Sequence, residues 1–164
     1  MSYGGVSVPV VLSVGDLLSC CASKRWATEV AAQGPFPSLD SLERVSAEVL
    51  AGVDWADVRA AIDAHPRIGE RVTGADREAA WSRDEQSAAA VVDERVRAEL
   101  VDGNVRYEKR FGHVFLICAT GLSAGDVLSA LRARLGNDDA VEREIVRAEL
   151  AKIVGLRLRK LVDR

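Results

Sequence analysis

Apolar residues recur every three or four positions along most of this 164-residue chain, and this spacing constrains its fold more than any other feature. The clearest stripe lies in residues 38–53. We expect further helices over residues 13–22, 24–33, 54–64, 82–110 and 123–135, and a last helix that Asn137 caps and that runs to about residue 161. Only residues 113–119 resemble a strand, and that segment is short and isolated. The prediction is an all-α, single-domain bundle of seven or eight helices.

Glycine and proline mark the expected breaks between these helices. The Gly-Pro-Phe-Pro run at 34–37 interrupts the chain, and residues 69–76 are expected to form a loop. The long segment 82–110 is predicted to be one helix, bent near Gly103. Gly112 is expected to end it in the left-handed conformation, and Gly121 is expected to allow a close approach of the backbone.

Composition excludes several classes of protein. Apolar residues make up 48% of the chain and charged residues 29%, which is typical of a globular domain and not of a disordered one. The net charge of −3 gives no basic field for nucleic acid or anionic lipid. No apolar run reaches the roughly 18 residues of a membrane-spanning helix, and the apolar stretch 6–14 lacks the preceding basic residues of a signal peptide.

The cysteines and histidines argue against disulfides and metal sites. Cys20, Cys21 and Cys118 form neither a disulfide framework nor a zinc-binding spacing, and the chain has only two histidines. The pattern suits a reducing compartment, so we expect a cytoplasmic protein that uses no metal.

His65 is the first candidate for chemistry, because Pro66 follows it directly. Proline disfavours helical geometry in the preceding residue, so the imidazole should lie at the carboxyl end of a helix. The helix dipole there favours the charged ring, and a histidine that is partly protonated at neutral pH is a suitable proton donor. The alternative is that His65 only caps the helix.

A second candidate is the polar run 82–86, formed by Ser82, Arg83, Asp84, Glu85 and Gln86. Its Ser-x-x-Glu spacing matches a capping box, which would explain Ser82 and Glu85 without any function. The same spacing places Ser82, Glu85 and Gln86 on one face of the first turn, where they suit a polar ligand rich in nitrogen. Exposed amides at the start of the helix would add further donors.

The third candidate is the extended segment 113–119. Peptide groups that are extended within a helical protein need hydrogen-bond partners, and a ligand is one such partner.

The fourth candidate is the basic C-terminal helix. In the C-terminal helix Arg157 lies between two leucines, so it is the arginine expected to point into a pocket and bind a carboxylate through both arms of its guanidinium. A solvated helix face is the default interpretation of its basic neighbours.

Taken together, these motifs resemble the 2-oxo-4-hydroxy-4-carboxy-5-ureidoimidazoline (OHCU) decarboxylase family over nearly the whole chain. Their order and separation carry the resemblance. The motifs are Cys21-x-Ser23-x-x-Trp26-Ala27, His65-Pro66-Arg67-Ile68-Gly69, Glu85-Gln86, Asn104-x-x-Tyr107-x-x-x-Phe111-Gly112 and Lys152-Ile153-x-x-Leu156-Arg157-Leu158.

The resemblance implies an all-helical lyase that needs no cofactor and converts OHCU to (S)-allantoin and CO2 in urate degradation. It implies that His65 is the proton donor, that Glu85 is a second catalytic residue, and that homodimers are compatible with the family. The substrate-binding residues that it implies are Pro66, Ser82, Arg83, Asp84, Glu85, Gln86, the backbone of Ile117, Cys118, Ala119, Thr120 and Gly121, and Arg157 or the nearby Arg159. The hypothesis is that Glu85 holds His65 in its productive tautomer and charge state.

Two other functions are compatible with the residues alone. One is a cofactor-independent hydrolase or isomerase of another cyclic ureide. The other is a helical ligand-binding module without catalysis, in which Ser82 and Glu85 only cap a helix and His65 only ends one.

Overall fold

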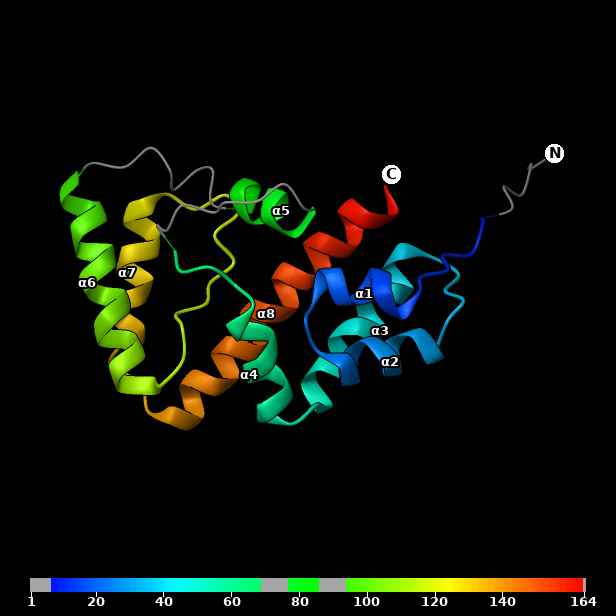
Figure 1. Ribbon diagram of the computed structural model, residues 1–164, viewed down its shortest axis with the longest axis horizontal. Helices are drawn as coiled ribbons and strands as arrows, with labels where there is room; N and C mark the ends of the chain where they lie inside the picture. The colour runs from blue at the N-terminus through cyan, green and yellow to red at the C-terminus, as the bar shows by residue number, and fades with distance from the viewer. Residues whose placement is uncertain (1–6, 69–76, 86–93, 164) are drawn as a thin grey trace.

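The computed structural model describes residues 7–68, 77–85 and 94–163, and within these residues the secondary structure is helical (Figure 1). The predicted all-α fold is confirmed. The eight described helices are α1 (Val14–Cys20), α2 (Lys24–Ala32), α3 (Leu39–Gly52), α4 (Trp55–Asp63), α5 (Arg77–Glu85), α6 (Glu94–Phe111), α7 (Ala124–Arg134) and α8 (Asp139–Val162).

Serine caps explain where four of these helices begin. The hydroxyls of Ser13, Ser23, Ser38 and Ser123 each accept a hydrogen bond from a backbone N–H in the first turn of the helix that follows. Such a bond satisfies an amide that has no partner within the helix. The last helix is capped by Asp138 and not, as predicted, by Asn137, whose side chain instead donates to Glu142.

The helix predicted over 82–110 falls on the end of α5 and nearly all of α6, and residues 86–93 lie outside the described part of the chain. α6 continues through Gly103. Ser82 lies inside α5 and Glu85 is the last described residue of that helix, so the predicted capping box at a helix start is wrong. A Ser-x-x-Glu spacing aligns two side chains equally well in any turn of a helix, and the residues before Ser82 continue the helix towards the N-terminus.

The segment 113–119 is extended, as the sequence predicts, but it has no strand partner among the described residues. The strand-like pairing found among the described residues is a single antiparallel bridge between Val10 and Phe36, away from this segment. Gly112 has a positive φ of 79°, which confirms its predicted role at the end of α6. Gly121 also has a positive φ of 80°, whereas no atom lies within 4 Å of the position of a Cβ there, so conformation and not close approach explains this glycine.

Two apolar cores meet at the extended segment, where Leu116 belongs to the larger core and Phe115 and Ile117 belong to the smaller one. The larger core is formed mainly by α1 to α4 and one side of α8, and the smaller by α6, α7 and the extended segment. In Figure 1, α8 crosses the molecule diagonally, from the end occupied by α6 and α7 to the end occupied by α1, α2 and α3. The extended segment and the end of α4 therefore lie where the two cores join.

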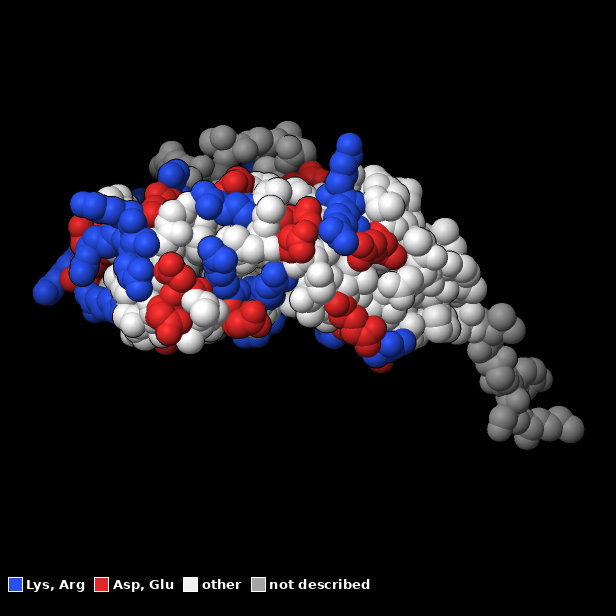
Figure 2. All heavy atoms as spheres, turned by 90° about the horizontal axis from the view of Figure 1, so that it is seen from below, with Lys and Arg blue, Asp and Glu red and all other residues white. Residues whose placement is uncertain are grey.

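The surface carries charges of both signs. On the face shown in Figure 2, basic and acidic side chains are interspersed, and the basic ones gather towards the end of the molecule that contains α6 and α7. None of the helices in the described ranges is both long and apolar enough to cross a bilayer.

Candidate active site

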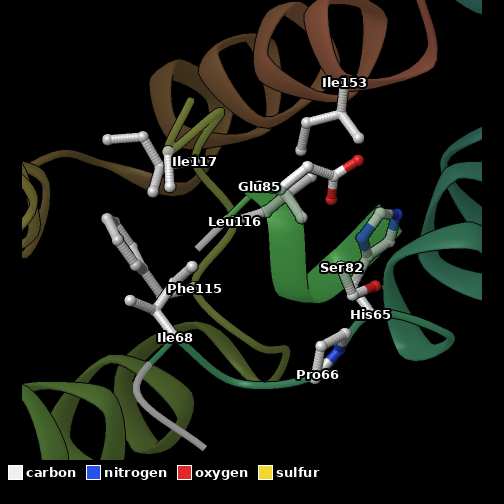
Figure 3. A pocket seen from close by; sticks show the side chains of 10 residues that line it. His65, Pro66, Ile68, Ser82, Glu85, Phe115, Leu116, Ile117 and Ile153 are labelled. Atoms are coloured by element: carbon white, nitrogen blue, oxygen red, sulfur yellow. The ribbon is translucent and has the colours of Figure 1, made fainter. Parts of the chain in front are cut away.

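A small cavity lies at the junction of the two cores, and it brings together side chains from four separate parts of the chain (Figure 3). The cavity that the described residues form has a volume of about 20 Å³. This is room for about one water molecule, so the walls must separate to admit a larger ligand. The lining residues are His65, Pro66, Ile68, Ser82, Glu85, Phe115, Leu116, Ile117, Ala119 and Ile153.

His65 reaches the cavity because α4 ends at Asp63, two residues before it. The backbone N–H of His65 still bonds to the carbonyl oxygen of Ile62 at 2.9 Å, and Pro66 then turns the chain away from the helix. The loop is held from α6, where the Asn104 amide donates to the carbonyl oxygen of Ile68 at 3.0 Å. The predicted position of His65 at a proline-induced helix end is confirmed.

The charge state of His65 differs from the prediction. Burial and, as the smaller cause, the positive charge of Arg157 together lower the pKa of His65 to about 3. The imidazole is therefore neutral at pH 7 in this structure, not partly protonated. The helix dipole favours the charged ring, but loss of solvent and the nearby guanidinium oppose the dipole and outweigh it.

Arg157 and Glu85 form a two-pronged ion pair beside the cavity. The Nε and one terminal nitrogen of Arg157 donate to the two carboxylate oxygens of Glu85 at 2.8 and 3.1 Å, and the same terminal nitrogen lies 3.3 Å from the hydroxyl of Ser82. Only 7% of the Arg157 side chain and 10% of the Glu85 side chain are exposed. Both carboxylate oxygens of Glu85 thus bond to Arg157, and among the described residues no hydrogen bond joins Glu85 to His65, so the role of Glu85 in holding His65 stays a prediction.

Arg159, the alternative to Arg157, points elsewhere. Its guanidinium pairs with Glu43 of α3, and more than half of its side chain is exposed. Of the two arginines, Arg157 is the one that contacts cavity-lining residues, because it bonds to Ser82 and Glu85.

The other predicted site residues are divided between the cavity and the surface. Pro66, Ile117 and Ala119 line the cavity, and Cys118 is partly buried beside them. Arg83 and Asp84 are exposed on α5, and Thr120 and Gly121 are exposed in the turn that follows the extended segment. Gln86 lies outside the described residues.

Sequence reasoning missed a buried polar cluster behind the extended segment. Arg134 bonds at 2.7 Å both to the carboxylate of Glu142 and to the carbonyl oxygen of Leu116, and Glu142 also accepts a hydrogen bond from Tyr107 at 2.5 Å. The Glu142 side chain is completely buried. A signal was present in the sequence, because Glu142 occupies the same helical stripe as Val146 and Leu150.

The cavity therefore offers a carboxylate, a hydroxyl, an imidazole and an extended backbone against apolar walls, and the guanidinium of Arg157 bonds to the carboxylate beside it. Within the described ranges, no group of three or more His, Cys, Asp or Glu side chains is placed to hold a metal ion. The arrangement defines a class of protein, namely an all-α protein with a small cavity lined by both polar and apolar side chains.

Comparison with known proteins narrows this class to a family. The family model for OHCU decarboxylase matches residues 12–159. The uric acid degradation bifunctional protein TTL of Arabidopsis thaliana is 35% identical over 145 residues, which cover 87% of this chain and 45% of that protein. The 2-oxo-4-hydroxy-4-carboxy-5-ureidoimidazoline decarboxylase of Amia calva is 31% identical over 131 residues, which cover 79% of this chain and 75% of that protein.

A solved structure agrees with these sequence matches. A crystal structure of OHCU decarboxylase in the presence of (S)-allantoin superimposes with a TM-score of 0.79 at 32% identity and covers 91% of this chain and 98% of that one. The chain belongs to the OHCU decarboxylase family. The predicted family and fold class are thereby confirmed, although the chain spans less than half of the Arabidopsis protein.

Proposed function

We propose that this protein decarboxylates OHCU to (S)-allantoin and CO2, and that His65 delivers the proton that fixes the configuration of the product. The observation that carries the proposal is the meeting of the His65 imidazole, the Ser82 hydroxyl and the Arg157–Glu85 ion pair at one small cavity. These groups come from the loop after α4, from α5 and from α8, so the fold brings them together from distant parts of the chain.

The substrate itself supplies the electron sink. The carbon that bears the carboxylate in OHCU also bears a hydroxyl and lies next to a ring C=N bond. When the bond to the carboxylate breaks, CO2 leaves and the electron pair forms a C=C bond, while the ring nitrogen takes up a proton. The hydroxyl then becomes a carbonyl by losing a proton, and the ureido-bearing carbon gains one. The reaction consumes one proton overall, which the protein must deliver on a single face.

Arg157 is the group that orients the substrate carboxylate in this proposal. A guanidinium binds a carboxylate through two parallel hydrogen bonds, and Arg157 already holds a carboxylate in this way, that of Glu85. Substrate binding would open the cavity and place a second carboxylate beside the same guanidinium. Ser82 and Gln86 would hydrogen-bond the amide groups of the ureido chain and the ring.

The neutral state of His65 fits a donor that is charged only when substrate arrives. The positive charge of Arg157 contributes to the low pKa of His65. A substrate anion on Arg157 offsets that charge and attracts a proton to the imidazole, so binding raises the pKa of His65. The proton would then be transferred to the ureido-bearing carbon after CO2 has left.

The test is to generate OHCU freshly from urate and to follow its decay by circular dichroism with and without the protein. The proposal expects rapid release of CO2 and accumulation of (S)-allantoin. Slow, racemic decay at the spontaneous rate would contradict it. Running the same assay on a panel of other cyclic ureides distinguishes the decarboxylase from a hydrolase or isomerase, which would open or rearrange a ring without releasing CO2. No turnover of any ureide would instead favour a ligand-binding module.

We also propose that the protein works in the cytoplasm, binds no nucleic acid and forms a homodimer. Val8 and Val11 near the N-terminus are 81% and 76% exposed, and they would be suited to burial against a second copy. Light scattering on the full chain tests the dimer, and Val8→Ser with Val11→Ser should shift the mass towards the monomer.

A further inference from the structure

The extended segment is held by side chains at alternate residues. A ring nitrogen of His113 lies 3.0 Å from the carbonyl oxygen of Val114, and Arg134 donates to the carbonyl oxygen of Leu116 at 2.7 Å. The backbone N–H of Cys118 donates to the carboxylate of Glu149 on α8 at 3.3 Å. Side chains from the bundle thus take the place of a neighbouring strand.

Two of these bonds fix the direction of the peptide groups of Ile117. In a planar trans peptide the carbonyl oxygen and the following N–H point in opposite directions. Because the carbonyl of Leu116 points to Arg134, the N–H of Ile117 points away from Arg134. Because the N–H of Cys118 points to Glu149, the carbonyl of Ile117 points away from Glu149.

Ile117 therefore presents one donor and one acceptor on the edge that faces away from these two side chains. Neither group forms a hydrogen bond with another residue in the described parts of the chain. Ile117 is buried and lines the cavity, and buried peptide groups normally have partners. An N–H and a C=O on one edge are complementary to the N–H and C=O of an amide or a ureide.

We propose that Arg134 and Glu149 are positioning residues for the substrate, because they orient Ile117 so that its two peptide groups hydrogen-bond the ureide groups of the ligand. The proposal rests on the proposed function and adds two residues to it. Neither residue contacts the substrate, so each acts through the backbone.

The surroundings of Arg134 suit this role better than a role in stability. A buried ion pair adds little net stability, because the desolvation of both charges offsets their attraction. What the pair with Glu142 provides is a fixed direction for the guanidinium, which also lies 4.5 Å from the ring centre of Phe115, another cavity residue. Glu142 and Phe115 thereby hold the guanidinium that donates to Leu116.

Glu149 offers a more specific experiment than Arg134, because three variants distinguish its bond to Cys118 from its contact with Lys152. Glu149→Ala removes the acceptor for Cys118, whereas Glu149→Gln keeps an oxygen that can accept the bond. Lys152→Ala is the matched control, because it removes the other contact of Glu149, at 3.4 Å, and leaves the bond to Cys118 intact. The readouts are KM and kcat for freshly generated OHCU, and hydrogen exchange of the Cys118 amide measured by NMR.

We expect Glu149→Ala to raise KM about 3- to 10-fold, which corresponds to the loss of one oriented hydrogen bond, and to change kcat less. The Cys118 amide should exchange faster in this variant only. Glu149→Gln and Lys152→Ala should stay close to the wild type in both readouts. An unchanged KM in Glu149→Ala, or an equal loss in Glu149→Gln, would overturn the proposal.

Arg134→Lys tests the second residue, provided that urea unfolding first shows a folded variant. It keeps a positive charge beside Glu142 but loses the planar fork that reaches both Glu142 and Leu116. The same rise in KM is expected, and a wild-type KM would contradict the role of Arg134. If the wild-type protein itself does not turn over OHCU, the proposed function fails, and the exchange of the Cys118 amide alone then decides whether Glu149 holds the segment.

Discussion

The guanidinium of Arg157 and the carboxylate of Glu85 lie 72 residues apart in the chain and form a buried, two-pronged ion pair beside the imidazole of His65. The pair joins the end of α5 to α8. In the proposed function, the guanidinium of this pair also binds the carboxylate of the substrate.

Glu85→Gln should destabilise the protein and abolish most of its activity. The amide keeps the shape of the side chain but leaves the buried charge of Arg157 without its counter-ion. Removing one partner of a buried pair costs roughly 3 kcal/mol or more, compared with about 1 kcal/mol for a helix cap. Urea unfolding measures this difference, and a loss limited to the size of a cap would contradict the buried pair.

Arg159→Lys is the matched control on the same helix. Its partner Glu43 lies on the surface of α3, away from the cavity. We expect unchanged kcat and KM for OHCU and a much smaller change in stability than in Glu85→Gln. A large loss of activity would show that Arg159, not Arg157, binds the substrate.

The low pKa of His65 predicts a pH dependence of stability. Between about pH 6.5 and pH 3 the unfolded chain binds a proton at this residue and the folded protein does not, so His65 makes stability fall as the pH falls through this window. The slope from one such group approaches about 1.4 kcal/mol per pH unit. Urea unfolding at pH 7, 6 and 5 should show a shallower decline in His65→Gln than in the wild type, and parallel declines would contradict the lowered pKa.

Two glycines should respond to alanine in opposite directions. A Cβ at Gly103 on α6 would lie 2.5 Å from a methyl carbon of Leu131 on α7, so Gly103→Ala should cost about 1–3 kcal/mol by overpacking the contact. At Gly155 on α8 no atom lies within 4 Å of that position, so Gly155→Ala should stabilise the helix by about 0.5–1 kcal/mol. Thermal unfolding of the two variants checks both signs, and a stabilising Gly103→Ala would disprove the close approach of α6 and α7.

Tyr107→Phe should destabilise the protein through the buried cluster. The hydroxyl donates to Glu142, and burial together with this bond raises the pKa of Tyr107, so the group stays protonated. Without it, one oxygen of a buried carboxylate loses a donor, which costs about 1–3 kcal/mol. Val105→Ala on the exposed side of α6 is the control and should change stability little. Equal stability of Tyr107→Phe and the wild type in urea would be the contrary result.

What the sequence predicted well depends on short-range rules. The helix ends at Gly112 and before Pro66 follow from backbone geometry, and the stripe in α3 follows from helical period, so their positions were predictable. The resemblance to a family placed His65 and Glu85 at one site, and the cavity contains both.

What it predicted poorly depends on contacts between distant residues. The Ser-x-x-Glu spacing of Ser82 and Glu85 fits any turn of a helix equally well. The sequence does not reveal that both side chains bond to Arg157, which lies far along the chain. The charge state of His65 also follows from burial and from Arg157, neither of which the dipeptide His-Pro reveals. Arg134 resembles an ordinary basic residue in the last turn of a helix until Glu142 and Leu116 are placed beside it.

The central claim is that His65 protonates one face of the intermediate, and the enantiomeric composition of the allantoin formed from fresh OHCU tests it most directly. We predict (S)-allantoin from the wild type, and racemic allantoin at the spontaneous rate from a folded His65→Gln variant. If that variant still produced (S)-allantoin at the wild-type rate, another group would be the proton donor and this account of the site would be wrong.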